Sequence, residues 1–457
     1  MSKSFSRRDF IKLAAAGVAG TFLAACKPKV VEKVVKETVV VEKEVTKEAP
    51  PKKKQVRILL SSWAVGEIPF DRTAREFNST RDDCEVKVQT TFEGWDTKVI
   101  AQINEGKLEW SAAGILTPFL VMYKWVKTGM VQPMEEYINA SKQEGADQVL
   151  TDMIETIKED GSFEGKFYSL AYSFENITFN WRVDYFNAVG VKEAPKTWDE
   201  WLSACLELKK WGAKDQIYPT AFAGALWTDV GALICAATDK PYTEEGLIDW
   251  KSQAMIDSLA FYKKLIVEEE LTPPHGTDGW LDAYYSGKVA SVQAQSSRGV
   301  WGQNAFGTDK VATSPIALKE KGIANAGSVY WGNGVAILNK APYPQEATDY
   351  LIYTMGPQNL DFQKTVIKTG KTPIYNSAYE KIIKGDPKFG VYRWMVEMLE
   401  NVKKSVPAPR NNYYTIQHTM FKKHIVNFTE KGSTMSPEEV AELIYKDSKE
   451  EIAKQKA

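Results

Sequence analysis

The chain has 457 residues and a formal net charge of −1, with 44% hydrophobic and 12% aromatic residues. This is an ordinary globular composition, and the chain is long enough for two domains. The balanced charge offers no basic surface for nucleic acid, so we expect no nucleic-acid partner.

The first 26 residues resemble a bacterial export signal. Arg7 and Arg8 lie in SRRDFIK, which resembles the twin-arginine motif S/T-R-R-x-F-L-K. The apolar run LAAAGVAGTFLAA that follows is shorter than the roughly 20 residues that span a bilayer, and it ends in small residues, as signal peptides do. Its end, LAAC, resembles a lipobox in which Cys26 is lipidated. We therefore expect residues 1–26 to be a signal peptide and Cys26 to anchor an exported lipoprotein on the extracytoplasmic face of the cell membrane.

Residues 27–54 form a segment rich in Val, Glu and Lys. The segment contains neither glycine nor an aromatic residue, and it closes with APPKKK. Such a composition cannot bury a core of its own. We expect it to be a tether that holds the following body off a membrane.

Strand-like and helix-like segments alternate through the body. The predicted strands are 56–60, 86–89 and 335–338. The predicted helices are 70–78, 96–104 and 344–355. Capping boxes at Thr197–Glu200 and Ser436–Glu439 predict two further helix starts. Strands that alternate with helices indicate α/β layers around a parallel or mixed sheet.

The cysteines and histidines lack the spacing of a metal site or a disulfide framework. If Cys26 carries lipid, an odd number of cysteines remains, and we expect buried thiols at Cys84, Cys205 and Cys235. The histidines are His275, His418 and His424, and no cluster of them with cysteines has ligand spacing. We expect no metal.

Motifs that would indicate an enzyme are incomplete. TGKT at 369–372 lacks the glycine that a phosphate-binding loop needs, because Thr365 stands there. WGNGVA at 331–336 lacks the third glycine of G-x-G-x-x-G, because Ile337 takes its place. No G-x-S-x-G element accompanies the histidines. We therefore expect neither an enzyme nor a cofactor, although the 59 acidic residues permit a pair of carboxylates for glycoside chemistry.

Five segments in the same order carry a family resemblance. They are TGMVQPMEEYI (128–138), the stretch FEGKFYSLAYSFENITFNW through TWDEWLSACLELKK (163–210), YYSGKVASVQAQSSRGVW (284–301), GSVYWGNGVAILNKAPYPQEATDYLIY (327–353) and GSTMSPEEVAELI (432–444). From about residue 55 to 450 the chain resembles the bacterial extracellular solute-binding proteins of sugar ABC transporters, family 1, which are similar to maltose-binding protein. Three departures from the family pattern are Ala171 in place of a proline, the wider spacing of Asn180 and Phe186, and the absence of the common P-D-h element from KLEWSAAGIL (107–116), where the loops would be rebuilt.

The resemblance implies an α/β fold of the two-lobe periplasmic-binding-protein type (type II-like), with a ligand cleft between lobes joined by crossing strands. Lobe 1 would comprise 55–168 plus 329–370, and lobe 2 would comprise 172–327 plus 373–457. The crossings would fall near 166–172, 326–331 and 370–373.

A sugar has apolar faces and a rim of hydroxyls, so its site needs aromatic rings and planar hydrogen-bonding groups. We expect such groups in loops after strands, beside the crossings and in the family's G-x-W stretch. The candidate ligand residues are Trp63, Glu93, Trp95, Tyr172, Glu175, Trp227, Ser297, Arg298, Trp331, Arg410 and Tyr413. Trp331 is the favoured single candidate because it lies beside glycines at a crossing. We expect packing roles for Trp198, Trp201 and Trp250.

These features predict a monomeric receptor that captures a carbohydrate, an oligosaccharide in preference to a monosaccharide, by hinge closure. Its partners would be the permease subunits of an ABC importer, with Cys26 holding it to the membrane. Three alternatives stay open: a cargo such as a glycerol phosphate ester or an acidic sugar, to which Arg298 and Arg410 are suited; a surface enzyme acting on polysaccharide; and a structural lipoprotein used for adhesion.

Overall fold

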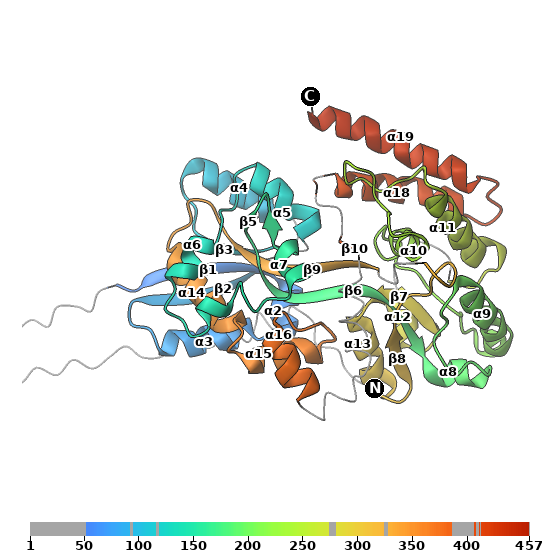
Figure 1. Ribbon diagram of the computed structural model, residues 1–457, viewed down its shortest axis with the longest axis horizontal. Helices are drawn as coiled ribbons and strands as arrows, with labels where there is room; N and C mark the ends of the chain where they lie inside the picture. The colour runs from blue at the N-terminus through green and yellow to red at the C-terminus, as the bar shows by residue number, and fades with distance from the viewer. Residues whose placement is uncertain are drawn as a thin grey trace, which may run out of the picture. The chain divides into compact units, whose positions relative to one another are not determined.

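The computed structural model describes residues 52–91, 95–115, 118–273, 280–323, 328–385, 406–407, 411 and 413–456. The compact body extends from Pro51 to Ala457 and is drawn in Figure 1. The expected signal peptide, Cys26 and almost all of the expected tether lie outside the described residues. Within the described ranges, no helix combines the length and hydropathy that a membrane span requires.

The helices and strands keep the labels of Figure 1. The strands are β1 (Lys54–Ser61), β2 (Cys84–Thr91), β3 (Ala112–Ile115), β4 (Ser162–Phe163), β5 (Lys166–Phe167), β6 (Leu170–Arg182), β7 (Ser291–Gln295), β8 (Val311–Ser314), β9 (Val329–Ile337) and β10 (Val406–Pro407). The helices of the first part are α2 (Ser62–Glu67), α3 (Phe70–Ser79), α4 (Trp95–Glu105), α5 (Pro118–Lys127), α6 (Glu135–Ala140), η1 (Ala146–Gln148), α7 (Glu155–Asp160), α8 (Val183–Ala188), α9 (Trp198–Gly212) and η2 (Ala213–Asp215). Those that follow are α10 (Val230–Ala237), α11 (Gln253–Lys263), η3 (Lys264–Glu268), α12 (Trp280–Tyr285), α13 (Ser297–Phe306), α14 (Pro344–Met355), α15 (Leu360–Lys368), α16 (Asn376–Ala378), η4 (Tyr379–Lys384), α18 (Tyr414–Thr429) and α19 (Pro437–Lys456).

One mixed sheet runs through the body in the order β2-β1-β3-β9-β6-β7, with β10 paired to β9 and β8 paired to β6. Strands β1, β2 and β3 are parallel, whereas β9 runs antiparallel to both β3 and β6. The long strand β6 changes partners along its length: residues 170–176 pair with β9, and residues 177–182 pair with β7 and β8. Figure 1 shows β6 and β9 side by side at this change of partners. The sheet thus connects two groups of helices.

Two large hydrophobic cores lie on either side of this change of partners. The first core collects buried side chains of β1, β2, α3, α14 and α15. The second core collects those of the later half of β6, α9, α10, α11, α18 and α19. A smaller cluster from β3, β9, α4 and α5 covers the other face of the first part of the sheet. Fully burying one Leu, Ile or Phe side chain is worth roughly 1.5–3 kcal/mol, so these cores dominate the stability of the fold.

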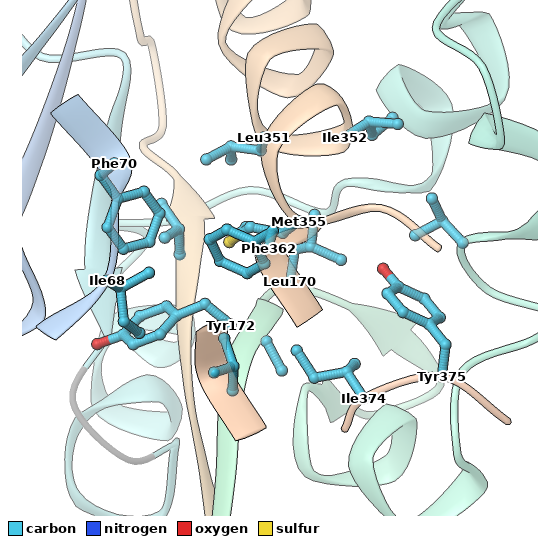
Figure 2. Packing of buried hydrophobic residues seen from close by; sticks show 14 of the residues in the cluster. Ile68, Phe70, Leu170, Tyr172, Leu351, Ile352, Met355, Phe362, Ile374 and Tyr375 are labelled. Carbon is cyan, nitrogen blue, oxygen red and sulfur yellow. The ribbon is translucent and has the colours of Figure 1, made fainter. Parts of the chain in front are cut away.

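The first core extends further along the chain than the lobe boundaries drawn from the sequence. Ile374 and Tyr375 were expected in lobe 2 with residues 373–457, yet they pack in the first core, which also contains Tyr172 (Figure 2). The physical reason is that Thr372 fastens this segment to β6: its backbone N–H and its hydroxyl both donate to Phe174 O at 3.0 Å. The π-helix η4 that follows then buries Ile382 and Ile383 in the same core.

The capping boxes form largely as predicted. Ser436 Oγ accepts from Glu439 N–H at 3.2 Å, and Glu439 Oε2 accepts from Ser436 N–H at 2.6 Å. At α9, Thr197 Oγ1 accepts from Glu200 N–H at 3.3 Å, but the Glu200 carboxylate accepts from the backbone N–H of Lys196, one residue before the N-cap. Both helices therefore begin where the sequence predicts.

The cysteines of the described ranges are buried and free, which confirms the predicted thiols at Cys84, Cys205 and Cys235. Burial raises the pKa of the Cys235 thiol to about 12, so it stays protonated and unreactive at neutral pH. Trp198, Trp201 and Trp250 are buried in the second core, as expected.

Candidate ligand site

Polar side chains interrupt β6 where the chain passes from the first core to the second. Ser173, Glu175 and Asn176 are buried there, and Glu175 is only 5% exposed. Ser173 is satisfied, because Asn333 Nδ2 on β9 donates to its Oγ at 3.1 Å. Buried polar groups are expensive unless they are paired, so those that lack a partner need an explanation.

Three buried atoms in this region lack such a partner. Glu175 Oε1, Asn176 Oδ1 and Arg298 Nε have no hydrogen-bond partner among the described residues. Two of them are acceptors and one is a donor. Leaving one such group unpaired costs about 1–3 kcal/mol, and the cost is larger for a charged group. A ligand that supplied hydroxyls here would recover that cost.

The start of α13 is held against β6 by backbone contacts. Ser296 N–H donates to Asn176 O at 3.2 Å, and Ser296 Oγ donates to Gly370 O at 2.9 Å. Gly370 has φ +84°, and a Cβ there would lie 2.7 Å from Ser297 Cα. Only glycine fits both the backbone conformation and this approach. The contacts place Ser297 and Arg298, at the start of α13, beside the polar stretch of β6.

The side chains of Arg298 and Ser297 have different surroundings. The Arg298 guanidinium carbon lies 4.3 Å from the centre of the Trp301 ring, a cation–π contact that orients the side chain. Ser297 is buried at the first turn of α13. Arg298 therefore presents a planar donor from an oriented side chain, the geometry suited to vicinal hydroxyls or a carboxylate.

Trp331 enters this region through the sheet. In the antiparallel register of β6 and β9, Trp331 is the direct partner of Glu175. Such partners lie on the same face of a sheet with Cβ atoms about 4.5–5.5 Å apart. The side chain of Trp331 is outside the described part of the structure. Its neighbour Gly332 donates its N–H to the buried Asp160 Oδ2 at 2.7 Å, which fixes the backbone of β9 at this point.

Trp227 is carried by a loop of the second core. The ring is half-buried and lies 4.6 Å from the His418 ring, centre to centre, and 6.3 Å from the Tyr414 ring. Leu226 N–H donates to His418 Nδ1 at 3.3 Å, which requires that nitrogen to be unprotonated. Burial, with a smaller effect of Lys422, lowers the pKa of His418 to about 4. His418 is thus a neutral support for the Trp227 loop at physiological pH.

The carboxylate of Asp229 holds the same loop in place through hydrogen bonds. Its carboxylate is fully buried and accepts four hydrogen bonds: from Ala223 N–H at 3.2 Å, Gly224 N–H at 2.9 Å, Thr228 Oγ1 at 2.7 Å and Tyr262 OH at 2.8 Å. Burial raises the pKa of Asp229 to about 6, although the hydrogen bonds oppose the shift. Asp229 is the N-cap residue of α10, yet its side chain makes no capping hydrogen bond to that helix and binds the preceding loop instead.

The structure brings together some predicted residues and separates others. Glu175, Ser297 and Arg298 gather where the two cores meet, with the backbone of Trp331 beside them. Trp227 lies with His418 on the second core, and Tyr413 lies before α18, where it lines a different pocket. Trp63 lies in α2, which follows β1 directly, and Trp95 is the first residue of α4, after β2, but their side chains are outside the described part. Glu93 and Arg410 are likewise outside the described residues.

Tyr172 corrects an expectation. It was predicted to face the ligand cleft, but it is 2% exposed and its ring packs edge-on against Phe70, with ring centres 5.4 Å apart (Figure 2). The reason is that every residue of β6 is buried, so both faces of the strand are covered and alternation along it does not select a solvent face.

Asp229 and His418 have structural roles that the sequence did not indicate.

The sequence pattern of the bacterial extracellular solute-binding proteins matches residues 72–391, and the chain belongs to this family. Its members are non-enzymatic components of ABC transporters that act outside the cytoplasm, which confirms the prediction that the chain is not an enzyme. Within the described residues, no cluster of His, Cys, Asp and Glu could hold a metal ion. No curated protein matches the sequence.

Several solved structures share the fold. An ABC substrate-binding protein of Listeria monocytogenes in complex with cycloalternan has a TM-score of 0.72 at 16% identity, covering 88% of this chain and 100% of that one. The sugar-binding protein MalE of Xanthomonas citri has 0.71 at 14%, covering 88% and 98%. The maltose-bound MalE3 of T. maritima has 0.69 at 15%, covering 86% and 99%. The expected α/β periplasmic-binding-protein fold is therefore confirmed.

Proposed function

We propose that this solute-binding protein captures a carbohydrate, an oligosaccharide, between its two lobes and delivers it to the permease of an ABC importer. The observation that carries the proposal is the group of buried, unpartnered atoms where the cores meet: Glu175 Oε1, Asn176 Oδ1 and Arg298 Nε. They belong to β6 and α13, two elements on the route between the cores.

A neutral sugar suits these atoms better than an ion does. Sugar hydroxyls can donate to Glu175 and Asn176 and accept from Arg298, so they would satisfy both the acceptors and the donor of the site. The tryptophan paired with Glu175 in the sheet, Trp331, would supply an apolar surface for the ring faces. The solved relatives named above include complexes with cycloalternan and maltose. These features together support a carbohydrate.

Capture would proceed by closure of the lobes. The ligand docks on one lobe, the connections at β6, β9 and residues 370–372 bend, and the other lobe completes the hydrogen bonds. Closure requires that the ligand bind the closed form more tightly than the open one. The same atoms that lack partners without ligand would supply this difference. A micromolar dissociation constant, about 8 kcal/mol of binding free energy, is sufficient for such a receptor.

The N-terminal region supports a tethered, exported receptor. The twin-arginine-like signal, the lipobox at Cys26 and the Val/Glu/Lys segment 27–54 would keep a monomeric body close to its permease. A lipid on Cys26 together with the tether confines the receptor to the membrane surface while leaving the two lobes free to move. The twin-arginine route exports folded proteins, so we infer that the lobes assemble before export.

The test is a panel of mono- and oligosaccharides, with a glycerol phosphate ester and an acidic sugar, scored by melting temperature and tryptophan fluorescence. The proposal expects saturable stabilisation by a neutral oligosaccharide that is recovered unchanged. Trp331→Ala should abolish that response, because it removes the proposed apolar surface. Preference for the phosphate ester or the acidic sugar would replace the carbohydrate assignment, and conversion of the sugar to a product would overturn the receptor itself.

A further inference from the structure

We propose a second small-molecule site, separate from the one on β6, that takes a single neutral sugar ring. It is a pocket of about 250 Å³ between the segment 243–250, the start of α18 and the helix α19. This volume is far above the roughly 30 Å³ that one water occupies in the liquid, and it lies just below the range of roughly 300–1,000 Å³ for drug-sized ligands. The occupant is therefore larger than a water and smaller than an oligosaccharide.

Two buried polar atoms belong to residues that line this pocket. Gln417 is 1% exposed and Ser448 is 4% exposed. Gln417 Nε2 and Ser448 Oγ have no hydrogen-bond partner in the part of the chain that the structure describes. The two atoms belong to different helices, α18 and α19. Poor packing of a single helix therefore does not explain why both atoms lack a partner. A ligand hydroxyl that accepted from Gln417 and paired with Ser448 would satisfy both atoms.

The pocket wall is built before any ligand arrives. Gln417 Oε1 accepts from Ile248 N–H at 3.0 Å and from Trp250 Nε1 at 3.2 Å, which fastens the segment 243–250 to α18. Asn411 Nδ2 donates to Gly246 O at 2.6 Å and secures the tip of the same segment. Because the acceptor half of the Gln417 amide is fully used, its orientation is fixed and its donor half is held in place. This preorganisation lowers the entropic cost of binding.

The chemistry of the wall favours a neutral, hydroxylated ring. Tyr413 and Tyr445 contribute aromatic surface, and Lys449 Nζ lies 3.4 Å from the Tyr445 hydroxyl. Glu245 and Asp249 line the pocket as well, and with Lys449 as the cation among these lining residues the wall disfavours an anion. Aromatic surface combined with several hydrogen-bonding groups is the pattern that suits a sugar.

The test compares D-glucose binding to the wild-type body and to variants by ligand-observed NMR, with a crystal soak to locate the sugar. Ser448→Ala removes one unpartnered hydroxyl and should leave the fold intact, since no hydrogen bond is lost. Ser258→Ala is the matched control, because Ser258 is also a buried helical serine but bonds Ala254 O, outside the pocket. Glu175→Ala separates this site from the one on β6.

We expect D-glucose to bind the wild type, Ser258→Ala and Glu175→Ala alike, and Ser448→Ala at least about tenfold more weakly, the effect of losing one good hydrogen bond. Gln417→Glu, which keeps the acceptor for Ile248 and Trp250 but loses the donor, should show the same loss. Equal binding to Ser448→Ala, loss of binding in Glu175→Ala, or no saturable binding to the wild type would each overturn the proposal. Because Glu175→Ala spares this site, the outcome is independent of the proposed oligosaccharide site.

Discussion

His418 accepts the backbone N–H of Leu226 through Nδ1 at 3.3 Å, and this bond joins helix α18 to the loop that carries Trp227. The two residues are separated by 192 positions in the chain. The bond exists only while Nδ1 is unprotonated, so the support of the Trp227 loop depends on the charge of one imidazole.

The first prediction concerns the loss of folding stability on acidification. The pKa of His418 is about 4 in the folded protein and about 6.5 when unfolded, so between these pH values the unfolded chain binds the extra proton. Stability should therefore fall as pH drops from 6.5 to 4, by up to about 3 kcal/mol from this residue. The measurement is urea unfolding at pH 7, 5.5 and 4.

His418→Asn is the variant to compare, since its amide oxygen can accept from Leu226 but does not titrate. It should be less stable than wild type at pH 7, because ring packing is lost, and should lose less stability on acidification. Asp229, whose pKa is raised to about 6, titrates in the same range but in both proteins, so it cancels in the comparison. Identical pH slopes for the two proteins would contradict the role of His418.

The second prediction concerns the close approach at Gly370. Gly370→Ala should destabilise the protein by about 2–4 kcal/mol, since it combines a positive φ with a Cβ placed 2.7 Å from Ser297 Cα. Gly165→Ala is the control: φ is +76° there, and within the described structure no heavy atom lies within 4 Å of the added Cβ. Chemical unfolding measures both. Equal costs at the two positions would show that α13 can move away from residue 370.

The third prediction concerns the unpartnered carboxylate on β6. Glu175→Gln should weaken binding of the sugar selected by the panel by at least about tenfold, since it exchanges a charged acceptor for an amide. The free energy of unfolding without ligand should be unchanged or higher, because a buried charge is removed. Isothermal titration with the exposed Glu268→Gln as control checks this. An unchanged affinity would remove Glu175 from the site.

The fourth prediction concerns export. Replacing Arg7 and Arg8 together by lysine should leave a folded, full-length precursor in the cytoplasm, because the twin-arginine route reads the arginine pair. Cell fractionation with limited proteolysis reports both the location and the folded state. Normal export of the double variant would indicate a different secretion route.

Local patterns in the sequence predicted much of the fold. Helix α3, predicted at 70–78, occupies Phe70–Ser79, and the capping box at Ser436 forms with both of its hydrogen bonds. Trp201 was expected to pack because it lies on the apolar side of a helix, and it is fully buried. Such features depend on neighbours within a few residues, which the sequence displays directly.

Features set by distant contacts were harder to predict. Tyr172 lies in the first core because Phe70 and its surroundings cover that face of β6, and alternation along a strand does not reveal a cover from elsewhere. The segment after Thr372 joins the first core through bonds to Phe174, 198 residues earlier. Of the site, the sequence indicated Glu175, Ser297 and Arg298, but not His418 or Asp229, whose partners come from loops and helices that only the fold brings together.

The central claim is that the unpartnered atoms between the two cores bind a carbohydrate. The most direct measurement is a crystal structure of the body with the oligosaccharide that the panel selects. We expect sugar hydroxyls within hydrogen-bonding distance of Glu175 Oε1 and Arg298 Nε, with one sugar ring against Trp331. A sugar bound elsewhere, with Glu175 and Arg298 still unpartnered, would contradict it.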